Sequence, residues 1–463
     1  MPPHCSKLHF WARVLDYKDI DRLNILRCLS LPTSNIFNFL KPLSLIKLNI
    51  KATITTFFVH LIFINSFAQS NDFKKHLAQN QENIDLTAAN NWNMLKIDAE
   101  KNQFIVLGES HGAKNTQLID YNLLEYLNKT VGTKNYIAEL DYAQAQNINE
   151  YLKTGNEKAL NTVFKYWVAE HAQWGNSDFY NKIVKIRTLN KTLSRKKRIT
   201  FTGIDAVQDY DRYLKLINGI IKNKNSNLLD SLKLLLNAPF SNESTTRILI
   251  FAKNYSQLVS QNEATLNKIL KKDYPIFKYL IQNLSYGNKS VGVKRPEAIY
   301  RNFEALYNVL HLENEKLYGM WGFFHAHLVP FYFVGQDFVS NLAKSKNPIA
   351  NKIISIVCLP IDSKYNVWDD KINSWTKEPF SYDNKSLLEV EGIEDVKELT
   401  KSNTTTLFKL DGTNSPFAKT GRLVNGSAPQ GKLVGDFKNK DYANQYIILM
   451  RDSDWLNPLP LNF

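Results

Sequence analysis

Residues 104–112 read Phe-Ile-Val-Leu-Gly-Glu-Ser-His-Gly, an apolar run that is closed by a glycine and then by Glu109, Ser110 and His111. The run has the length of one buried strand, and apolar side chains then recur at helical spacing from Ile119 to Leu127. A strand followed directly by an amphipathic helix is the repeating unit of a parallel α/β sheet. The stretch therefore predicts an α/β fold with Glu109 and His111 at the carboxyl end of a strand.

Three more apolar runs end in acids or histidines. Glu139 follows residues 136–138, Asp205 follows 199–202 by way of Gly-Ile, and His325 and His327 follow 317–321. Two later runs, 353–359 and 446–450, predict further strands. Ligands bind beyond the carboxyl ends of parallel strands, so we expect these acids and histidines to converge at one sheet edge.

The rest of the chain divides into two further regions. Residues 209–300 carry helical stripes throughout and predict a helical insertion, which is either a cap over the site or plain scaffold. Residues 365–429 are polar and turn-rich, and predict a C-terminal part made of strands and loops. The expected fold class is α/β, with a mainly parallel sheet flanked by helices.

Composition and charge exclude several classes of protein. The 463 residues are 44% hydrophobic and 22% charged, as in a globular protein rather than a disordered chain. The formal charge is +14, but the basic residues are spread along the chain and match no nucleic-acid-binding signature, so we expect no nucleic-acid partner. Of the three cysteines, Cys358 lies in an apolar run that favours a buried structural thiol.

The N-terminal region has the pattern of a secretory signal. Lys47 and Lys51 precede an apolar run that ends near Ile64, and residues 66–68 read Ser-Phe-Ala. We therefore predict an extension outside the fold at 1–45, which indicates a start site assigned too far upstream, and a signal peptide at 46–68. The mature domain is expected at 69–463, exported to the periplasm or secreted, with no stable membrane span; an uncleaved anchor is the alternative.

The spacing of the site residues suggests their chemistry. Alternation along an extended segment places Glu109 and His111 on one side, where a carboxylate orients an imidazole as a general base or a metal ligand. His325 and His327 are also two residues apart. For both pairs, the alternative to a catalytic or metal-binding role is a structural hydrogen-bonded network at the sheet edge. Gly108–Gly112 also fits the G-x-S-x-G elbow, with Ser110 as nucleophile and Asp205 and His325 as its partners. Against this, Ser110 should point away from Glu109 and His111.

The paired G-x-x-H elements at 108–111 and 322–325 resemble the erythromycin esterase, ChaN and TraB/TIKI superfamily, most closely its erythromycin esterase-like branch. Shared features are Asn-x-Tyr-Leu at 149–152, Arg187 and Asn190 before Gly-Ile-Asp at 203–205, and the helix at 295–310 with Arg301 and Glu304. The Glu-x-His spacing at 109–111 is more like ChaN-type proteins, and His-Ala-His at 325–327 departs from the branch's second motif.

This resemblance implies water-mediated hydrolysis. We expect a hydrolase that cleaves an ester or a related bond in a small molecule, with His111 as base, Glu109 or Glu139 as its orienting carboxylate, and His325 as a second base, acid or metal ligand. Arg301 would stabilise the oxyanion and Asp205 would support the site. The cofactor is either absent or a divalent metal held by Glu109, His111, Glu139 and His325. The alternatives are a metal-dependent peptidase of the TraB/TIKI type and a non-catalytic haem-binding or other ligand-binding protein.

Overall fold

The computed structural model describes residues 71–87, 92–241, 244–288, 291–332, 334–335, 337–384, 388–429 and 431–463. The chain divides into two compact units, Met1–Gln79 and Asn80–Phe463. In the first unit, residues 71–79 are helical. The predicted extension and signal peptide, residues 1–68, lie outside the described residues.

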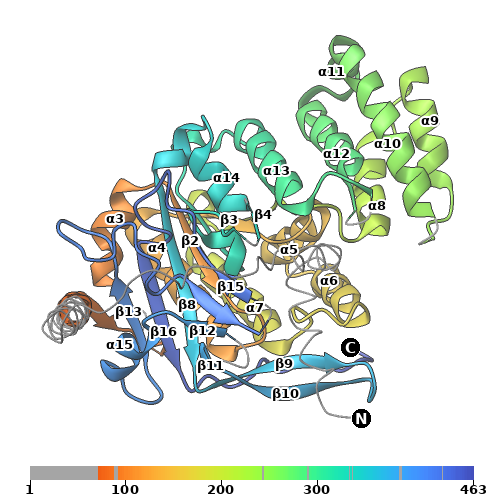
Figure 1. Ribbon diagram of the computed structural model, residues 1–463. Coiled ribbons are helices and arrows are strands. Elements are labelled where there is room, and N and C mark those ends of the chain that lie inside the picture. The colour runs from red at the N-terminus through yellow and green to blue at the C-terminus, as the bar shows by residue number, and fades with distance from the viewer. Residues whose placement is uncertain are drawn as a thin grey trace, which may run out of the picture. The chain divides into compact units, whose positions relative to one another are not determined.

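The second unit is built on an eight-stranded sheet with the order β1-β13-β16-β8-β2-β7-β3-β4 (Figure 1). Six neighbouring strands are parallel, and β13 and β1 join them in antiparallel pairing. The strands are β1 (Gln81–Asn83), β2 (Phe104–Glu109), β3 (Asn135–Ala138), β4 (Thr200–Gly203), β7 (Leu317–Gly322), β8 (Ile353–Ile361), β13 (Thr405–Lys409) and β16 (Tyr446–Arg451). The predicted α/β fold with a mainly parallel sheet is confirmed.

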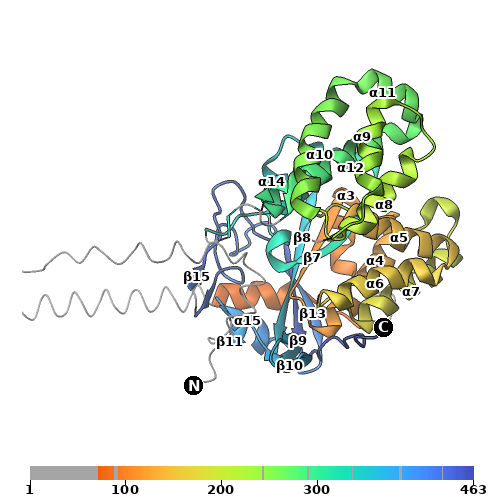
Figure 2. The same cartoon turned by 90° about the vertical axis from the view of Figure 1, so that its right-hand side faces the viewer.

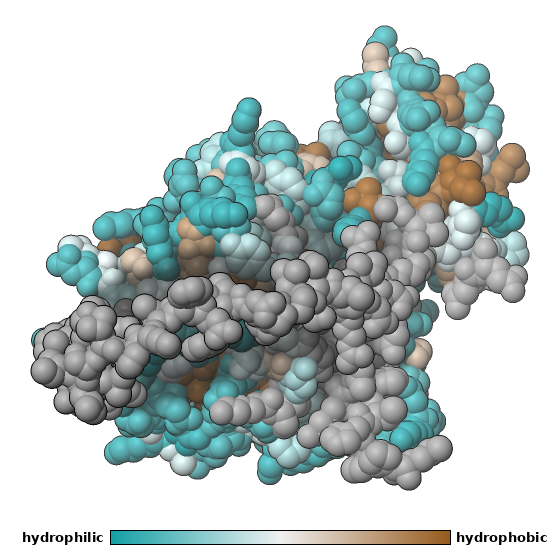
Figure 3. Space-filling view, viewed as in Figure 1, coloured by the Kyte–Doolittle hydropathy of each residue, from teal (hydrophilic) through white to brown (hydrophobic). Residues whose placement is uncertain are grey.

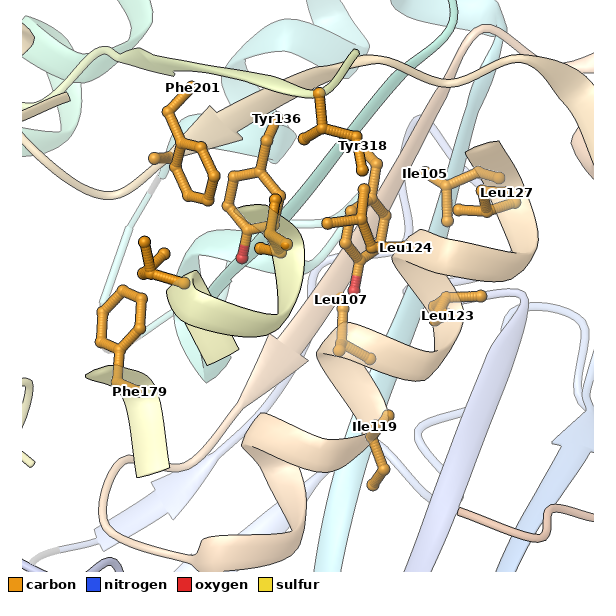
Figure 4. Packing of buried hydrophobic residues seen from close by; sticks show 14 of the residues in the cluster. Ile105, Leu107, Ile119, Leu123, Leu124, Leu127, Tyr136, Phe179, Phe201 and Tyr318 are labelled. Carbon is orange, nitrogen blue, oxygen red and sulfur yellow. The ribbon is translucent and has the colours of Figure 1, made fainter. Parts of the chain in front are cut away.

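Helices cover both faces of this sheet (Figures 1 and 2). Their bounds are α3 (Lys96–Lys101), α4 (Lys114–Val131), α5 (Tyr142–Thr154), α6 (Glu157–Ala169), α7 (Ser177–Thr192), α13 (Arg295–Val309), α14 (Phe338–Lys344) and α15 (Ile393–Glu398). On one face, apolar side chains of β2, β3 and β7 pack against α4 and α7, as the close view in Figure 4 shows for Leu107, Leu123 and Phe179. On the other face, Phe104 stacks on Phe303 of α13.

The edge strand β4 is closed by two asparagine side chains. The amide of Asn149 donates to the Phe201 carbonyl and accepts from the Phe201 N–H, both at 2.7 Å. Asn190 makes the same pair of bonds to Ile199, at 2.9 and 2.7 Å. Each amide replaces a residue of the missing neighbouring strand, so the backbone groups at this edge are satisfied without a further strand. The Asn-x-Tyr-Leu and Arg…Asn patterns thus have a structural role here.

The helical insertion is present, as α8 (Tyr210–Ile221), α9 (Asn227–Asn237), α10 (Ser244–Gln261), α11 (Glu263–Leu270) and α12 (Tyr274–Tyr286), followed by the short strands β5 (Gly287–Asn288) and β6 (Val291–Gly292). Figure 1 shows that α9–α12 project away from the sheet. On the face seen in Figure 3 the described surface is largely hydrophilic, with apolar residues reaching it in this part. Leu234 and Ile250 are both more than half exposed there.

The C-terminal part adds smaller sheets, as the sequence predicts. β9 (Ser363–Asp369) and β10 (Ser374–Phe380) form a hairpin, and β11 (Asp383–Asn384), β12 (Leu388–Val390), β14 (Gly426–Ala428) and β15 (Gly431–Leu433) form a four-stranded sheet. Cys358 is buried in β8, where burial raises the pKa of its thiol. None of the helices in the described ranges is both long and apolar enough to span a membrane.

Candidate functional site

Four neighbouring strands deliver polar side chains to one edge of the sheet. β2 ends at Glu109 and leads to His111, β3 is followed by Glu139, β4 is followed by Asp205, and β7 leads through a short 3₁₀ turn, Phe323–Ala326, to His325. Because all four strands are parallel, their carboxyl ends lie together.

Glu109 and His111 form a dyad. The Glu109 Oε1 atom accepts a hydrogen bond from Nδ1 of His111, and the imidazole ring packs against Trp174 with the ring centroids 4.5 Å apart. The His111 side chain is 24% exposed and that of Glu109 is 6% exposed. Within the described part of the chain, no hydrogen bond involves Nε2 of His111. A carboxylate thus fixes the ring tautomer, and the lone pair of Nε2 is free to take a proton.

The charge of the His111 ring is set by its acidic neighbours. Burial by itself lowers the pKa of His111, but the Glu109 and Glu139 carboxylates outweigh it and raise the pKa above 6.5. His325 acts in the opposite sense, because a second cation nearby disfavours protonation.

Arg295 connects three of the strand ends. Its guanidinium donates two hydrogen bonds from Nη2, one to Oε1 of Glu139 at 2.7 Å and one to Oδ2 of Asp205 at 2.6 Å. Nε donates to Oδ1 of Asp205 at 3.0 Å, so that carboxylate is bound by both nitrogens. Asp205 is fully buried, and Arg295 supplies the positive charge that its burial requires.

His325 lies between two carboxylates. Its Nδ1 is 2.5 Å from Oδ1 of Asp337, and its Nε2 is 3.3 Å from Oε1 of Glu139. Burial opposes protonation of the ring, but Asp337 and Glu139 raise the pKa of His325 to about 10. At neutral pH the ring is therefore an imidazolium whose two N–H groups face these acids. In the neutral form, Nε2 would accept from Nη1 of Arg295, which lies 3.0 Å away.

Arg295, Glu139, Asp205, His325 and Asp337 together form the Arg295 cluster. Gly322 lies between this cluster and the Glu109–His111 dyad. Its N–H donates to Oε2 of Glu139 at 2.7 Å. A Cβ atom on Gly322 would lie 3.2 Å from both Cε1 and Nε2 of His111, and 3.5 Å from Oε2 of Glu139. Although burial opposes it, the surrounding cations His325, Arg295 and His111 hold the pKa of Glu139 well below its usual range. Glu109, His111, Glu139, Asp205 and His325 are thus brought together.

Two predicted site residues, Arg301 and His327, lie elsewhere. Arg301 pairs with Glu297 one turn away on α13 and is about half exposed, so it does not contact the cluster. It is six residues beyond Arg295, which turns it about 120° around the helix away from the sheet edge. His327 is buried, and its Nδ1 pairs with the Asn444 side chain. The expected common side for His325 and His327 is wrong because the 323–326 segment is a 3₁₀ turn, in which residues two apart point in different directions.

Ser110 points away from the dyad, as alternation predicts. Its hydroxyl contacts the Tyr382 hydroxyl, and both side chains are buried. In the described residues, no histidine is hydrogen-bonded to Ser110.

Two residues that the sequence did not single out complete the site. Arg295 carried no local signal beyond its position at the start of a helix, and Asp337 follows no predicted strand. Asp337 is the N-cap of α14, and its partner Ser340 completes a capping box. A helix start that carries an acid after the second histidine strand was the available hint.

The donor set does not suit a divalent metal. Both oxygens of Glu139 already accept hydrogen bonds, and both ring nitrogens of His325 have polar partners. The guanidinium of Arg295 occupies the position between Glu139 and Asp205 where a cation would be held. Across the ranges described, no three acidic, histidine or cysteine side chains are grouped as metal ligands.

Known structures share this fold. No protein-family model and no curated protein matches the sequence. A Bacillus cereus protein is similar with a TM-score of 0.65 at 16% identity, over 84% of this chain and 99% of that one. A succinoglycan biosynthesis protein is similar with a TM-score of 0.61 at 14% identity, over 84% and 99%. A variant of the erythromycin esterase EreC in its open conformation is similar with a TM-score of 0.56 at 12% identity, over 80% and 95%. The predicted likeness in fold to erythromycin esterase is confirmed, and at this level of identity the likeness concerns the fold alone.

Proposed function

We propose that the chain is a hydrolase in which His111 activates water to cleave an ester or a related bond in a small molecule. The observation that carries this proposal is the His111 ring itself. Nδ1 is bound to Glu109, the side chain is partly exposed, and Nε2 faces the cluster without a hydrogen bond from any described residue. A general base needs this arrangement.

The bonds made and broken follow from these positions. The water oxygen attacks the carbonyl carbon while Nε2 of His111 takes one of its protons. The tetrahedral intermediate then collapses, the bond to the leaving oxygen breaks, and that oxygen takes a proton from the imidazolium. The products are an acid and an alcohol, and His111 returns to its starting state.

The cations of the site take different roles from those expected. Arg295, a quarter exposed, replaces Arg301 as the group that stabilises the developing oxyanion. With a pKa of about 10, His325 is charged at neutral pH and is unsuited to act as a base. It acts as an acid or as the group that fixes Glu139.

Export belongs to the same proposal and rests on the Lys47 to Ala68 pattern of the sequence. N-terminal sequencing of the protein recovered outside the cytoplasm should find a start near Gln69. Recovery of an intact Met1 from the cytoplasm would contradict it.

A paired variant experiment tests the mechanism. With a panel of p-nitrophenyl esters as probes, His111→Ala should lose nearly all hydrolysis, about 10²–10⁴-fold, because the base is removed. Ser110→Ala should keep most of it, since Ser110 faces Tyr382. Loss of activity in Ser110→Ala, together with labelling of Ser110 by a phosphonate, would establish a serine nucleophile instead.

A further inference from the structure

A charged pair lies inside the apolar layer behind the dyad. Nζ of Lys182, on α7, is 2.5 Å from Oδ2 of Asp120, on α4, and the two residues are 3% and 0% exposed. The hydroxyls of Tyr136 and Tyr318 donate to the two oxygens of Asp120, each at 2.8 Å. Figure 4 shows both tyrosines among the core side chains, between the sheet and α4.

Stability alone does not account for this pair. Two charges lose their hydration when they are buried, and an apolar pair of similar volume often packs as well or better. The surrounding side chains are apolar or aromatic, and the ammonium lies 4.0 Å from the centre of the Phe179 ring.

The pair lies on the face of the sheet that carries Glu109. Side chains at alternate positions of β2 share a face, and Ile105 and Leu107 pack in the same cluster as Tyr136 and Tyr318. Glu109 is two residues beyond Leu107 in β2, so its side chain lies on this same face. Its Oε2 is buried and makes no hydrogen bond within the described residues. The ammonium group of Lys182 has three N–H donors. Among the described residues, its hydrogen-bond partner is Asp120.

We propose that Lys182, held in place by Asp120, is a positioning residue that keeps the Glu109 carboxylate turned toward His111. This rests on the proposed function and deepens it. Burial lowers the pKa of Lys182, while the carboxylates of Asp120 and Glu109 oppose that effect. The lysine adds a positive charge near the buried Glu109 carboxylate, whose Oε2 has no hydrogen-bond partner among the described residues.

Other charged and titratable groups also face the dyad and must be kept constant in any test. His111 interacts with Glu139 and His325 besides Glu109. Groups that interact with Glu109 besides His111 and Lys182 are Tyr136, Tyr382 and Cys358.

The test is a titration of His111 without substrate, so its outcome does not depend on whether the protein hydrolyses anything. Nuclear magnetic resonance of protein labelled with ¹³C-histidine follows the ring, and His111→Ala assigns its signal. Removing a cation near the dyad increases the proton affinity of the dyad. Lys182→Met should therefore raise the pKa of His111 by about half a unit or more, whereas Lys182→Arg should leave it unchanged.

Two further variants keep the result decisive. If Lys182→Met does not fold, Lys182→Gln removes the same positive charge, leaves Asp120 and its two tyrosine partners in place and should give the same upward shift. Arg422→Met breaks a different ion pair, with the buried Asp395, and should not move the titration. A folded Lys182 variant without charge whose His111 titrates as in the wild type would overturn the proposal.

Discussion

His325 and Asp337 form the closest polar contact of the Arg295 cluster, with Nδ1 and Oδ1 2.5 Å apart. Asp337 also caps α14 and accepts a hydrogen bond from the Phe338 N–H at 2.6 Å. One carboxylate thus starts a helix and fixes the charge of the histidine.

Asp337→Asn separates these two roles, because asparagine caps a helix as well as aspartate does. The pKa of His325 should fall from about 10 by roughly one to three units, as measured by titration of its ring signal. Ser340→Ala, which breaks the capping box but keeps the charge, is the control and should leave this titration unchanged. An unchanged pKa in Asp337→Asn would show that Asp337 does not set the charge of His325.

Gly322→Ala tests how tightly His111 is placed. The new methyl group would lie 3.2 Å from Cε1 and Nε2 of His111, so the ring must shift. Since general-base catalysis depends on position, we expect ester hydrolysis to fall by about tenfold or more. Gly219→Ala is the matched control and should retain full activity, because an added Cβ atom there would meet no described heavy atom within 4 Å besides its chain neighbours and its own helix backbone. Equal activity in the two variants would mean that His111 has room to move.

Arg295 and Arg301 offer a comparison of two arginines on one helix. Arg295→Lys keeps the charge but loses the bidentate contact with Asp205, and hydrolysis should fall by about 10²-fold. Arg301→Ala removes an exposed pair with Glu297, which contributes about 0–1 kcal/mol, and a contact over the Tyr286 ring, and activity should remain. The reverse outcome would restore Arg301 as the oxyanion group. Steady-state kinetics on the same ester decide between them.

His327 makes the protein less stable in acid. Burial lowers the pKa of His327 to about 4, from the usual histidine value of 6.5. The unfolded chain therefore binds a proton at this position that the folded chain does not, once the pH falls below 6.5. Stability is lost between pH 6.5 and 4, by about 3 kcal/mol in all. Urea unfolding at pH 7 and pH 5 should show a smaller decline in His327→Gln than in the wild type, and equal declines would contradict this assignment.

The strands and their closing residues could be predicted because their signals are local. β2, β3, β4 and β7 are apolar runs, and the acid or histidine that follows each of them reaches the sheet edge as parallel strands require. β13 was missed because its residues, Thr405–Lys409, lie in a polar, turn-rich stretch.

The partners of these residues could not be predicted in the same way. Asp337 and Arg295 reach the site through the packing of α13 and α14 on the sheet, and no spacing in the sequence records that approach. Arg301 lies on the same helix as Arg295, α13, but on the side turned away from the sheet edge. The alternation that would place His325 and His327 on one side holds for an extended strand, whereas the chain forms a 3₁₀ turn at Phe323–Ala326.

The most direct test of the account is the pH dependence of kcat/KM for a p-nitrophenyl ester, measured beside the titration of His111. The base form of His111 is required, and Glu109 and Glu139 raise its pKa above 6.5. We predict that kcat/KM rises tenfold per pH unit up to that pKa and is constant above it, and that Glu109→Gln moves the limb to lower pH. A profile that falls across this range, or a limb that Glu109→Gln leaves in place, would contradict His111 as the base.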